Sequence, residues 1–383
     1  MELHLIGGFL GSGKTTAILE AARLLVERGQ RVGIITNEQG KHLVDTGFLR
    51  ASGLPALEVT GGCVCCQLDD FADRVEEITA KFNPQVLFAE SVGSCTDLVA
   101  TVVKPLVDYR KTSAQPASLS VFSDSRLLLR YLRDQELPFS ESVIYIFEKQ
   151  IVETNLLIAN KIDLLSDADA RDLLRLAVEK YPHKTIRPQN SLNEGQVAEW
   201  LALIQSQTLS LPEISLDLDY DAYAGGEGRF AWVDRELSIS LPELNPGAMA
   251  ADLIRRFVRA ISKESAQIAH LKFLVSDGSR QLRLNFTSLD EPEVKMASQL
   301  PKLDTLAGNQ INLLVNLMAE GDVSALETAL NAIILFFAEE NNITIQETAR
   351  FSCVPGYPKP TMRIGNQKFL IKPLEETADG RHH

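Results

Sequence analysis

The first half of the chain alternates short apolar runs with amphipathic stretches. The apolar runs are four or five residues long, which is typical of strands covered on both faces, and they occupy residues 3–6, 32–36, 56–59, 86–89 and 155–159. Around them, helical periodicity predicts helices over residues 15–28, 68–82, 96–106 and 167–180. This alternation predicts an α/β fold, with a doubly wound, mainly parallel sheet and ligand sites at the carboxyl ends of its strands.

The pattern changes in the second half of the chain. It loosens over residues 208–229, so we expect a linker there that separates residues 1–207 from residues 230–383. Beyond the linker, the periodicity predicts strands over residues 230–239, 311–318 and 343–351 and helices over residues 248–261 and 325–338. A hairpin turn is expected at Ser276-Asp277-Gly278. These elements predict a smaller α+β domain with two β-α-β-like halves.

A glycine-rich segment joins the first predicted strand to the first predicted helix. It satisfies the spacing G-x-x-x-x-G-K-[ST] in the strand–loop–helix context of a P-loop. Its glycines let the backbone wrap around a phosphate, and the helix N-terminus adds a partial positive charge. We expect Lys14 to reach the β- and γ-phosphates and the Thr15 hydroxyl to ligate Mg²⁺. The predicted phosphate-binding residues are Gly8, Gly11, Ser12, Gly13, Lys14, Thr15 and Thr16.

A second motif points to the base of the nucleotide. Asn160, Lys161 and Asp163 form the N-K-x-D pattern of guanine-nucleotide proteins directly after a predicted strand. The Asn160 amide can bond the O6/N7 edge of guanine, and the Asp163 carboxylate can accept from N1–H and the N2 amino group, which adenine lacks. The Lys161 stem would pack over the base. Ser191 lies where such proteins place a further base-contacting loop, although a strand cap and a helix cap would also account for N-K-x-D.

Two other strand ends are candidates for sensing the γ-phosphate. Glu90 ends the fourth apolar run and is followed three residues later by Gly93, so Glu90 can hold the Mg²⁺ shell or its water while the Gly93 N–H meets the phosphate. The alternative for Glu90 is a surface acid at a strand end. Asn37 and Glu38 open a polar loop that runs to Asp45.

Three of the five cysteines occupy four positions, namely Cys63, Cys65 and Cys66. A disulfide framework would space its cysteines out and favour an even number. Three thiolates suit Zn²⁺, Cu(I) or Co²⁺ and do not suit Mg²⁺, so the cluster predicts a transition-metal site, with a buried inert cluster as the alternative. A tetrahedral ion needs a fourth ligand, for which Glu38, His42 and Cys95 are the candidates.

The order of these motifs resembles that of the CobW-like GTPases, metallochaperones related to the hydrogenase- and urease-maturation GTPases. The resemblance covers about the first 200 residues and rests on GGFLGSGKTT, NEQG…VD, GGCVCC, ESVG and NKID. It implies GTP hydrolysis coupled to delivery of a transition metal to a client metalloenzyme or corrinoid protein. The matching residues are Lys14, Thr15, Asn37, Glu38, Asp45, Cys63, Cys65, Cys66, Glu90, Gly93, Asn160, Lys161 and Asp163.

The sequence also departs from that family. Lys41-His42 replaces acidic and small residues in the switch, and Ser94-Cys95-Thr96-Asp97 replaces an ending in Asp-Pro. The second half resembles the family's C-terminal domain only through the stretch 269–273, where we interpret His270 as structural, as we do Cys353. The proline-rich stretch 351–360 is either a surface that grips a partner or a plain tail.

Composition narrows the classes of function. The 383 residues are 45% hydrophobic and 23% charged, as in an ordinary globular protein. The net charge of −13 argues against binding to nucleic acid or anionic lipid through bulk electrostatics, but it leaves room for a backbone phosphate site. The apolar runs are far shorter than the ~20 residues of a membrane span, and the first residues resemble no signal peptide, so we expect a cytoplasmic protein.

Three hypotheses follow. The first is a GTPase whose nucleotide state gates the cysteine metal site, with GTP or GDP, Mg²⁺, Zn²⁺ or Co²⁺ and a client protein as its ligands and partners. The second is a metal buffer in which GTP turnover is incidental, and the third, which N-K-x-D disfavours, is a P-loop small-molecule kinase. The metal, the client and the oligomeric state, including a homodimer, are left open by the sequence.

Overall fold

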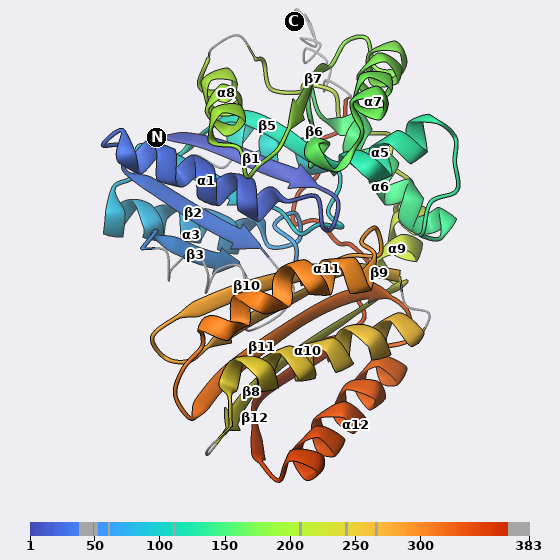
Figure 1. Cartoon of the computed structure of the whole chain (residues 1–383). Helices are drawn as coiled ribbons and strands as arrows, with labels where there is room; N and C mark the ends of the chain where they lie inside the picture. Colours follow the sequence, from blue (N-terminus) through green and yellow to red (C-terminus); the bar gives the residue numbers. More distant parts are fainter. Residues whose placement is uncertain are drawn as a thin grey trace, which may run out of the picture.

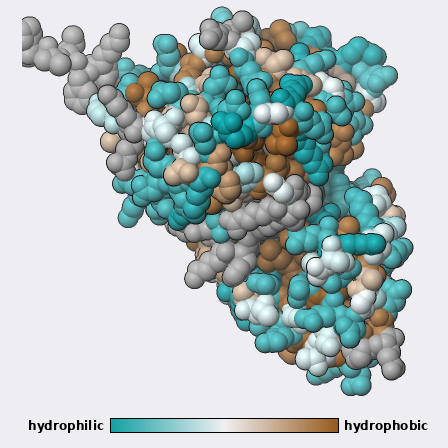
Figure 2. All heavy atoms as spheres, turned by 90° about the vertical axis from the view of Figure 1, so that its left-hand side faces the viewer, coloured by the Kyte–Doolittle hydropathy of each residue, from teal (hydrophilic) through white to brown (hydrophobic). Residues whose placement is uncertain are grey.

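The computed structural model describes residues 1–37, 49, 53–59, 62–109, 112–206, 209–241, 244–264 and 267–366. Two sheets organise these residues into two lobes that meet at a narrower waist (Figures 1 and 2). None of the helices in this part of the chain combines the length and the apolar character that a membrane crossing requires.

The first sheet has seven strands in the order β3-β2-β4-β1-β5-β6-β7, and every neighbouring pair is parallel. The predicted α/β class with a parallel sheet is therefore confirmed. The strands are β1 (Glu2–Gly8), β2 (Val32–Asn37), β3 (Ala56–Val59), β4 (Val86–Glu90), β5 (Gln115–Asp124), β6 (Leu156–Asn160) and β7 (Thr185–Gln189). Strands β5 and β7 were not among the apolar runs, because serines interrupt β5 and most of β7, at the sheet edge, is only half-buried.

Helices cover both faces of this sheet (Figure 1). Helices α1 (Lys14–Glu27) and α8 (Glu194–Gln205) share one apolar cluster with alternate residues of the strands, such as Val86 and Phe88. The other residues of the same strands, such as Leu87 and Ala89, belong to the cluster on the opposite face. The helices that contribute to it are α3 (Leu68–Phe82), α4 (Lys104–Asp108) with the π-helix Val99–Val103, α5 (Ser125–Leu132), α6 (Glu141–Glu153) and α7 (Asp167–Lys180).

The second sheet has five antiparallel strands in the order β10-β9-β11-β8-β12. They are β8 (Phe230–Ser240), β9 (Gln267–Ser276), β10 (Gln281–Phe286), β11 (Gln310–Glu320) and β12 (Thr344–Cys353). Helices α10 (Pro246–Lys263) and α12 (Val323–Asn341) pack on one face through an apolar core, and α11 (Pro292–Gln299) follows β10. The smaller α+β second domain is thus confirmed.

The expected linker contains a helix. Residues 209–219 have no regular secondary structure, but α9 (Tyr220–Glu227) begins at the N-cap Asp219, whose side chain accepts from the backbone N–H groups of Asp221 and Ala222. A Cβ at Gly226 would lie 2.4 Å from the carbonyl oxygen of Ser142, so this glycine allows α9 to pack closely on α6. The segment expected to be a linker therefore includes a glycine that permits a helix contact.

An ion-pair network joins the two domains at the end of β5. Asp124, 3% exposed, lies 3.0 Å from Lys161 Nζ and 2.8 Å from Arg126 Nη2. Arg126 in turn donates to the Leu289 carbonyl oxygen and pairs with Asp290 of the second domain at 3.1 Å. Burial would raise the pKa of Asp124, but Lys161 and Arg126 outweigh it and hold the pKa at about 2.

We expect Asp124→Asn to lower the free energy of unfolding by about 2 kcal/mol, because it keeps the N-cap bond to the Arg126 N–H and removes only the buried charge. Glu179→Gln, in an exposed pair with Arg175, is the control and should cost no more than about 0.5 kcal/mol. Urea unfolding measures both. Because the pKa of Asp124 is lowered, its contribution is present above the ordinary value of 3.8 and should fade as the pH falls to about 2. Equal losses in the two variants would contradict the network's role.

Candidate functional site

The glycine-rich loop between β1 and α1 curls around its own lysine. Gly8, Gly11 and Gly13 have φ angles of 124°, 72° and 91°, in the left-handed region that favours glycine. Lys14 is 6% exposed and its Nζ donates to the carbonyl oxygens of Gly8 at 2.8 Å and Phe9 at 3.3 Å. The loop therefore has the backbone path and the buried cation of a phosphate site.

Asn160, at the end of β6, joins the loop to the other predicted base-binding residues. Its Nδ2 donates to the Ser12 carbonyl oxygen at 2.7 Å, and its Oδ1 accepts from the Ser191 N–H at 3.1 Å and from Ser191 Oγ at 2.8 Å. A Cβ at Gly13 would lie 2.4 Å from Asn160 Nδ2, so the second glycine of the motif makes room for this amide. Ser191 thus fixes the orientation of Asn160.

The remaining N-K-x-D residues line one hollow of about 360 Å³ with Asn160 and Ser191. Asp163 is exposed, and Lys161 takes a left-handed conformation with φ 59°, which turns the chain sharply after β6. The structure therefore brings the predicted base-binding residues to one place, beside Gly13 and Thr16 of the loop.

The predicted Mg²⁺ ligands also meet. Thr15 Oγ1 donates to Glu90 Oε1 at 3.0 Å, and Glu90 is 8% exposed at the end of β4. A Cβ at Gly93 would lie 2.7 Å from Leu10 Cδ2, so Gly93 lets the segment after β4 lie against the loop. Two hard oxygen ligands so close to the phosphate loop suit Mg²⁺.

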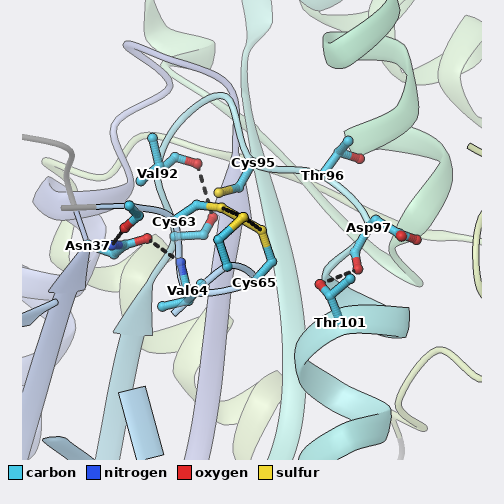
Figure 3. Close-up of a disulfide and its surroundings, with 12 residues drawn as sticks. Asn37, Cys63, Val64, Cys65, Val92, Cys95, Thr96, Asp97 and Thr101 are labelled. Atoms are coloured by element: carbon cyan, nitrogen blue, oxygen red, sulfur yellow. Dashed lines mark hydrogen bonds between the residues drawn. A yellow bond between two sulfur atoms is a disulfide. The ribbon is translucent and has the colours of Figure 1, made fainter. Parts of the chain in front are cut away.

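The three clustered cysteines form a tight turn between β3 and α3 (Figure 3). The N–H groups of Cys66 and Gln67 both donate to the Cys63 carbonyl oxygen. The sulfur of Cys66 lies 3.3 Å from that of Cys63 and 3.7 Å from that of Cys65. Two thiolates on a tetrahedral Zn²⁺ at about 2.3 Å are about 3.8 Å apart, so the spacing fits joint coordination.

The structure joins Cys63 to Cys65 as a disulfide, whereas the sequence predicted three thiols (Figure 3). The turn that brings the sulfurs together permits this bond, and all three sulfurs are available to a metal only after its reduction. Burial raises the pKa of the Cys66 thiol, and metal binding has to displace its proton.

The candidates for a fourth ligand are only partly placed. Glu38, His42 and the loop to Asp45 lie outside the described residues. Cys95 is 1% exposed in the same apolar cluster as the motif, and burial raises the pKa of its thiol well above the ordinary value. Within the described part of the chain, Cys63, Cys65 and Cys66 form the one group of potential metal ligands whose atoms lie within 4.8 Å of one another.

Asn37, the last residue of β2, holds the cysteine turn in place (Figure 3). Its Nδ2 donates to the carbonyl oxygens of Val59 at 3.1 Å and Gly62 at 2.8 Å, and its Oδ1 accepts from the Val64 N–H at 2.8 Å. Asn37 also lines the hollow that contains Lys14, Thr15 and Glu90. The sequence pattern included Asn37 in a family motif but assigned it no such role.

A C-terminal strap, residues 354–366, returns from the second domain to the cysteine turn. The Thr361 N–H donates to the Cys65 carbonyl oxygen at 3.1 Å, and Thr361 Oγ1 donates to that of Cys66 at 3.0 Å. Farther along, Arg363 Nε pairs with the buried Asp97 at 2.7 Å. The stretch 351–360 leads into these contacts, so it is not a plain tail, whereas its use as a partner surface stays a prediction.

These features define a P-loop nucleotide-binding domain with a cysteine cluster beside its phosphate loop. Residues 2–187 match the model of the family described as CobW/HypB/UreG, nucleotide-binding domain. The first half of the chain is therefore a nucleotide-binding domain of this family, as the motif order suggested.

The curated relatives agree with this assignment. The zinc chaperone CobW of Sinorhizobium sp is 32% identical over 182 residues, which cover 42% of this chain and 50% of the relative. The zinc chaperone YeiR of Escherichia coli (strain K12) is 31% identical over a match that covers 45% of this chain and 50% of the relative. The urease accessory protein UreG of Aliarcobacter butzleri is 36% identical over 113 residues and covers 27% and 56%. The chain thus spans about half the length of the curated relatives it matches.

Solved structures show weaker likeness. HypB from Helicobacter pylori in complex with nickel has a TM-score of 0.38 at 15% identity, covering 53% of this chain and 85% of the other. Zn(II)-bound YjiA GTPase from Escherichia coli has a TM-score of 0.34 at 12% identity, and the match covers 87% of this chain and 98% of the other. At these scores the likeness adds nothing to the assignment.

We expect Asn37→Ala to loosen the cysteine turn, because it removes three hydrogen bonds of roughly 1 kcal/mol each. After reduction, the clustered thiols should react with a disulfide reagent roughly 10-fold faster or more, as measured by stopped-flow and localised by peptide mass spectrometry. Asn155→Ala, whose side chain makes one long bond of 3.3 Å to Ser210, is the control. Unchanged labelling in Asn37→Ala would show that the turn is held by other contacts.

Proposed function

We propose that the protein binds and hydrolyses GTP and uses the nucleotide state to control a transition metal, Zn²⁺ or Co²⁺, held by Cys63, Cys65 and Cys66. The metal is the cargo, which the protein delivers to a client metalloenzyme or corrinoid protein. The names of the relatives, zinc chaperones and a urease accessory protein, support this type of activity.

The observation that carries the proposal is the position of Asn37. This residue lines the phosphate hollow, and its side chain makes three hydrogen bonds that fix the cysteine turn. A change in nucleotide state at the end of β2 therefore reaches the metal ligands through one residue. Coupling of this kind follows the γ-phosphate-dependent ordering of switch segments in other GTPases.

Each predicted residue has a definite task in the hydrolysis of GTP. Lys14 leaves its carbonyl partners and binds the β- and γ-phosphates, while the loop N–H groups hold the phosphate oxygens. Thr15 and Glu90 would hold Mg²⁺, which neutralises charge on the phosphates. Gly93 offers its N–H to the γ-phosphate, and Glu90 orients the attacking water.

The base is recognised by the other motif. Asn160 keeps a second Nδ2–H for the O6/N7 edge of guanine after its bond to Ser12, because an amide has two donors. Asp163 accepts from N1–H and the N2 amino group. Ser191 acts by holding Asn160 in the orientation that this contact needs.

Nucleotide preference tests the first part of the proposal. GTP should bind at least about 100-fold more tightly than ATP, because a site built for the N1 and N2 donors is left unpaired by adenine. Asp163→Asn should weaken GTP binding and shift the preference toward xanthine nucleotides, whose C2 oxygen accepts from the new amide. Fluorescent-nucleotide titrations measure these affinities, and equal binding of ATP and GTP to the native protein would overturn the assignment.

Metal affinity in the two nucleotide states tests the second part. We expect Co²⁺ to bind the reduced protein about 5- to 150-fold more tightly with a non-hydrolysable GTP analogue than with GDP, read from the thiolate-to-cobalt charge-transfer band. Affinity should rise with pH, because the thiols lose protons on binding. The variant with all three clustered cysteines changed to serine should lose the band, whereas Cys353→Ser should keep it. Equal affinity in both states would indicate a metal buffer rather than a gated chaperone.

A further inference from the structure

The second domain presents a polar sheet face to the phosphate loop. Along β10, Arg283 and Asn285 alternate with the apolar Leu282, Leu284 and Phe286. Along β9, His270 and Lys272 alternate with apolar residues in the same way, and Lys272 pairs with Asn285 in the register. Most apolar residues of both strands, though not Ala269 and Leu274, belong to the core beneath α10 and α12, so the polar residues that alternate with them face away from it. In a small domain, such a polar face is a candidate binding surface.

This face lies in direct contact with the P-loop. A Cβ on Gly11 would meet Thr287 Cγ2 at 2.8 Å and the Ala269 carbonyl oxygen at 3.0 Å. The contact is held from the side by Arg126, which reaches Leu289 and Asp290. The second domain is therefore docked on the nucleotide loop itself.

The two hollows of the nucleotide site are consequently lined by both domains. The phosphate hollow is bounded by the loop, by Glu90 and Gly93, and on the other side by Trp232, His270, Lys272, Arg283, Asn285 and Thr287. The base hollow has Arg283, Asn285, Lys295, Gln299 and Lys302 on its second wall. Arg283 and Asn285 belong to both hollows, as do Gly13, Thr16 and Lys161 of the first domain. A nucleotide that spans the hollows passes beside Arg283.

Cations gather in this cleft although the chain carries a net charge of −13. Lys272, Arg283, Lys295 and Lys302 from the second domain face Lys14 and Lys161 from the first. Burial lowers the pKa of Lys295, and the charges of Lys161 and Arg126 lower it further against the attraction of Asp290. Crowded cations of this kind favour a polyanion between them.

We propose that the β9–β10 face of the second domain is the other wall of the GTP site, where Arg283 binds the triphosphate and acts as a catalytic arginine supplied within the same chain, with Lys272 on the γ-phosphate side. This inference rests on the proposed GTPase function and deepens it. The guanidinium has a planar fork of donors that matches phosphate oxygens.

The chemical consequence concerns the leaving group. During transfer of the γ-phosphoryl group to water, negative charge grows on the oxygens of the departing GDP, and a preorganised cation there lowers the barrier. Because Arg283 lies on a separate domain, its position over the loop depends on the docking contacts at Gly11 and Arg126. GTP and GDP would then differ in how strongly they hold the two domains together.

The test compares four full-length variants in single-turnover GTP hydrolysis and in titration with fluorescent GTP and GDP. Removal of one donor from a preorganised site costs roughly 10²–10³ in kcat, so Arg283→Ala should lose about that factor. Arg283→Lys keeps the charge without the fork and should recover only part of it. Arg280→Ala is the matched control, because Arg280 lies on the same hairpin, is exposed and bonds the Thr305 carbonyl oxygen outside the cleft. Lys14→Ala marks the complete loss of the site.

The outcomes separate this inference from the proposed function. A native protein that neither binds nor hydrolyses GTP would overturn the function. Native-like affinity and rate in both Arg283 variants, with Lys14→Ala inactive, would leave the GTPase and overturn the role of Arg283. Thermal melting of each variant without nucleotide shows whether it is folded. If Arg283→Ala is not folded, the rate of Arg283→Lys decides the role of Arg283. A loss of rate in the Arg283 variants, with Arg280→Ala unchanged, supports the second wall.

Discussion

The contact between Asp124 and Arg126 is the constraint on which the rest of the site depends. Asp124 is buried at the carboxyl end of β5, and two cations compensate its charge. Lys161 pairs with it beside the base hollow, and Arg126 pairs with it on the side of the second domain. Arg126 also forms an ion pair with Asp290 of the second domain. One carboxylate thereby fixes the turn after β6 relative to the domain that lies over the P-loop, so that the cleft has two walls instead of one.

Two asparagines at strand ends do the corresponding work inside the first domain. Asn160 ties the P-loop to the Ser191 loop, and Asn37 ties β3 to the cysteine turn. An amide suits both positions because it donates and accepts at once, whereas a carboxylate can only accept when ionised. Substitution by aspartate at either position would therefore leave a buried carbonyl oxygen facing a carboxylate.

Much of the first domain could be predicted because its signals are local. The glycines before Lys14, the apolar run before Asn160 and the spacing of Cys63, Cys65 and Cys66 all lie within a few residues of one another, and each element is set by that short stretch. The missed features depend on distant partners. Helix α9 was hidden by its glycines, of which Gly226 packs against Ser142. Strand β5 was hidden by Ser118 and Ser120, which bond His4 and Trp200. Nothing near Arg283 in the sequence indicates that it faces a loop more than 250 residues earlier.

Because the strap lies near the end of the sequence, its contacts with the cysteine turn form late in synthesis. Thr361 donates hydrogen bonds to the carbonyl oxygens of Cys65 and Cys66, and 295 positions in the sequence separate it from Cys66. Domains generally fold as units while the chain leaves the ribosome, first domain first. The nucleotide domain can therefore form its sheet and its P-loop early, while the cysteine turn waits for its final contacts until nearly the whole chain has been made. During translation, the growing chain passes through a period in which its P-loop is formed before its cysteine turn is complete.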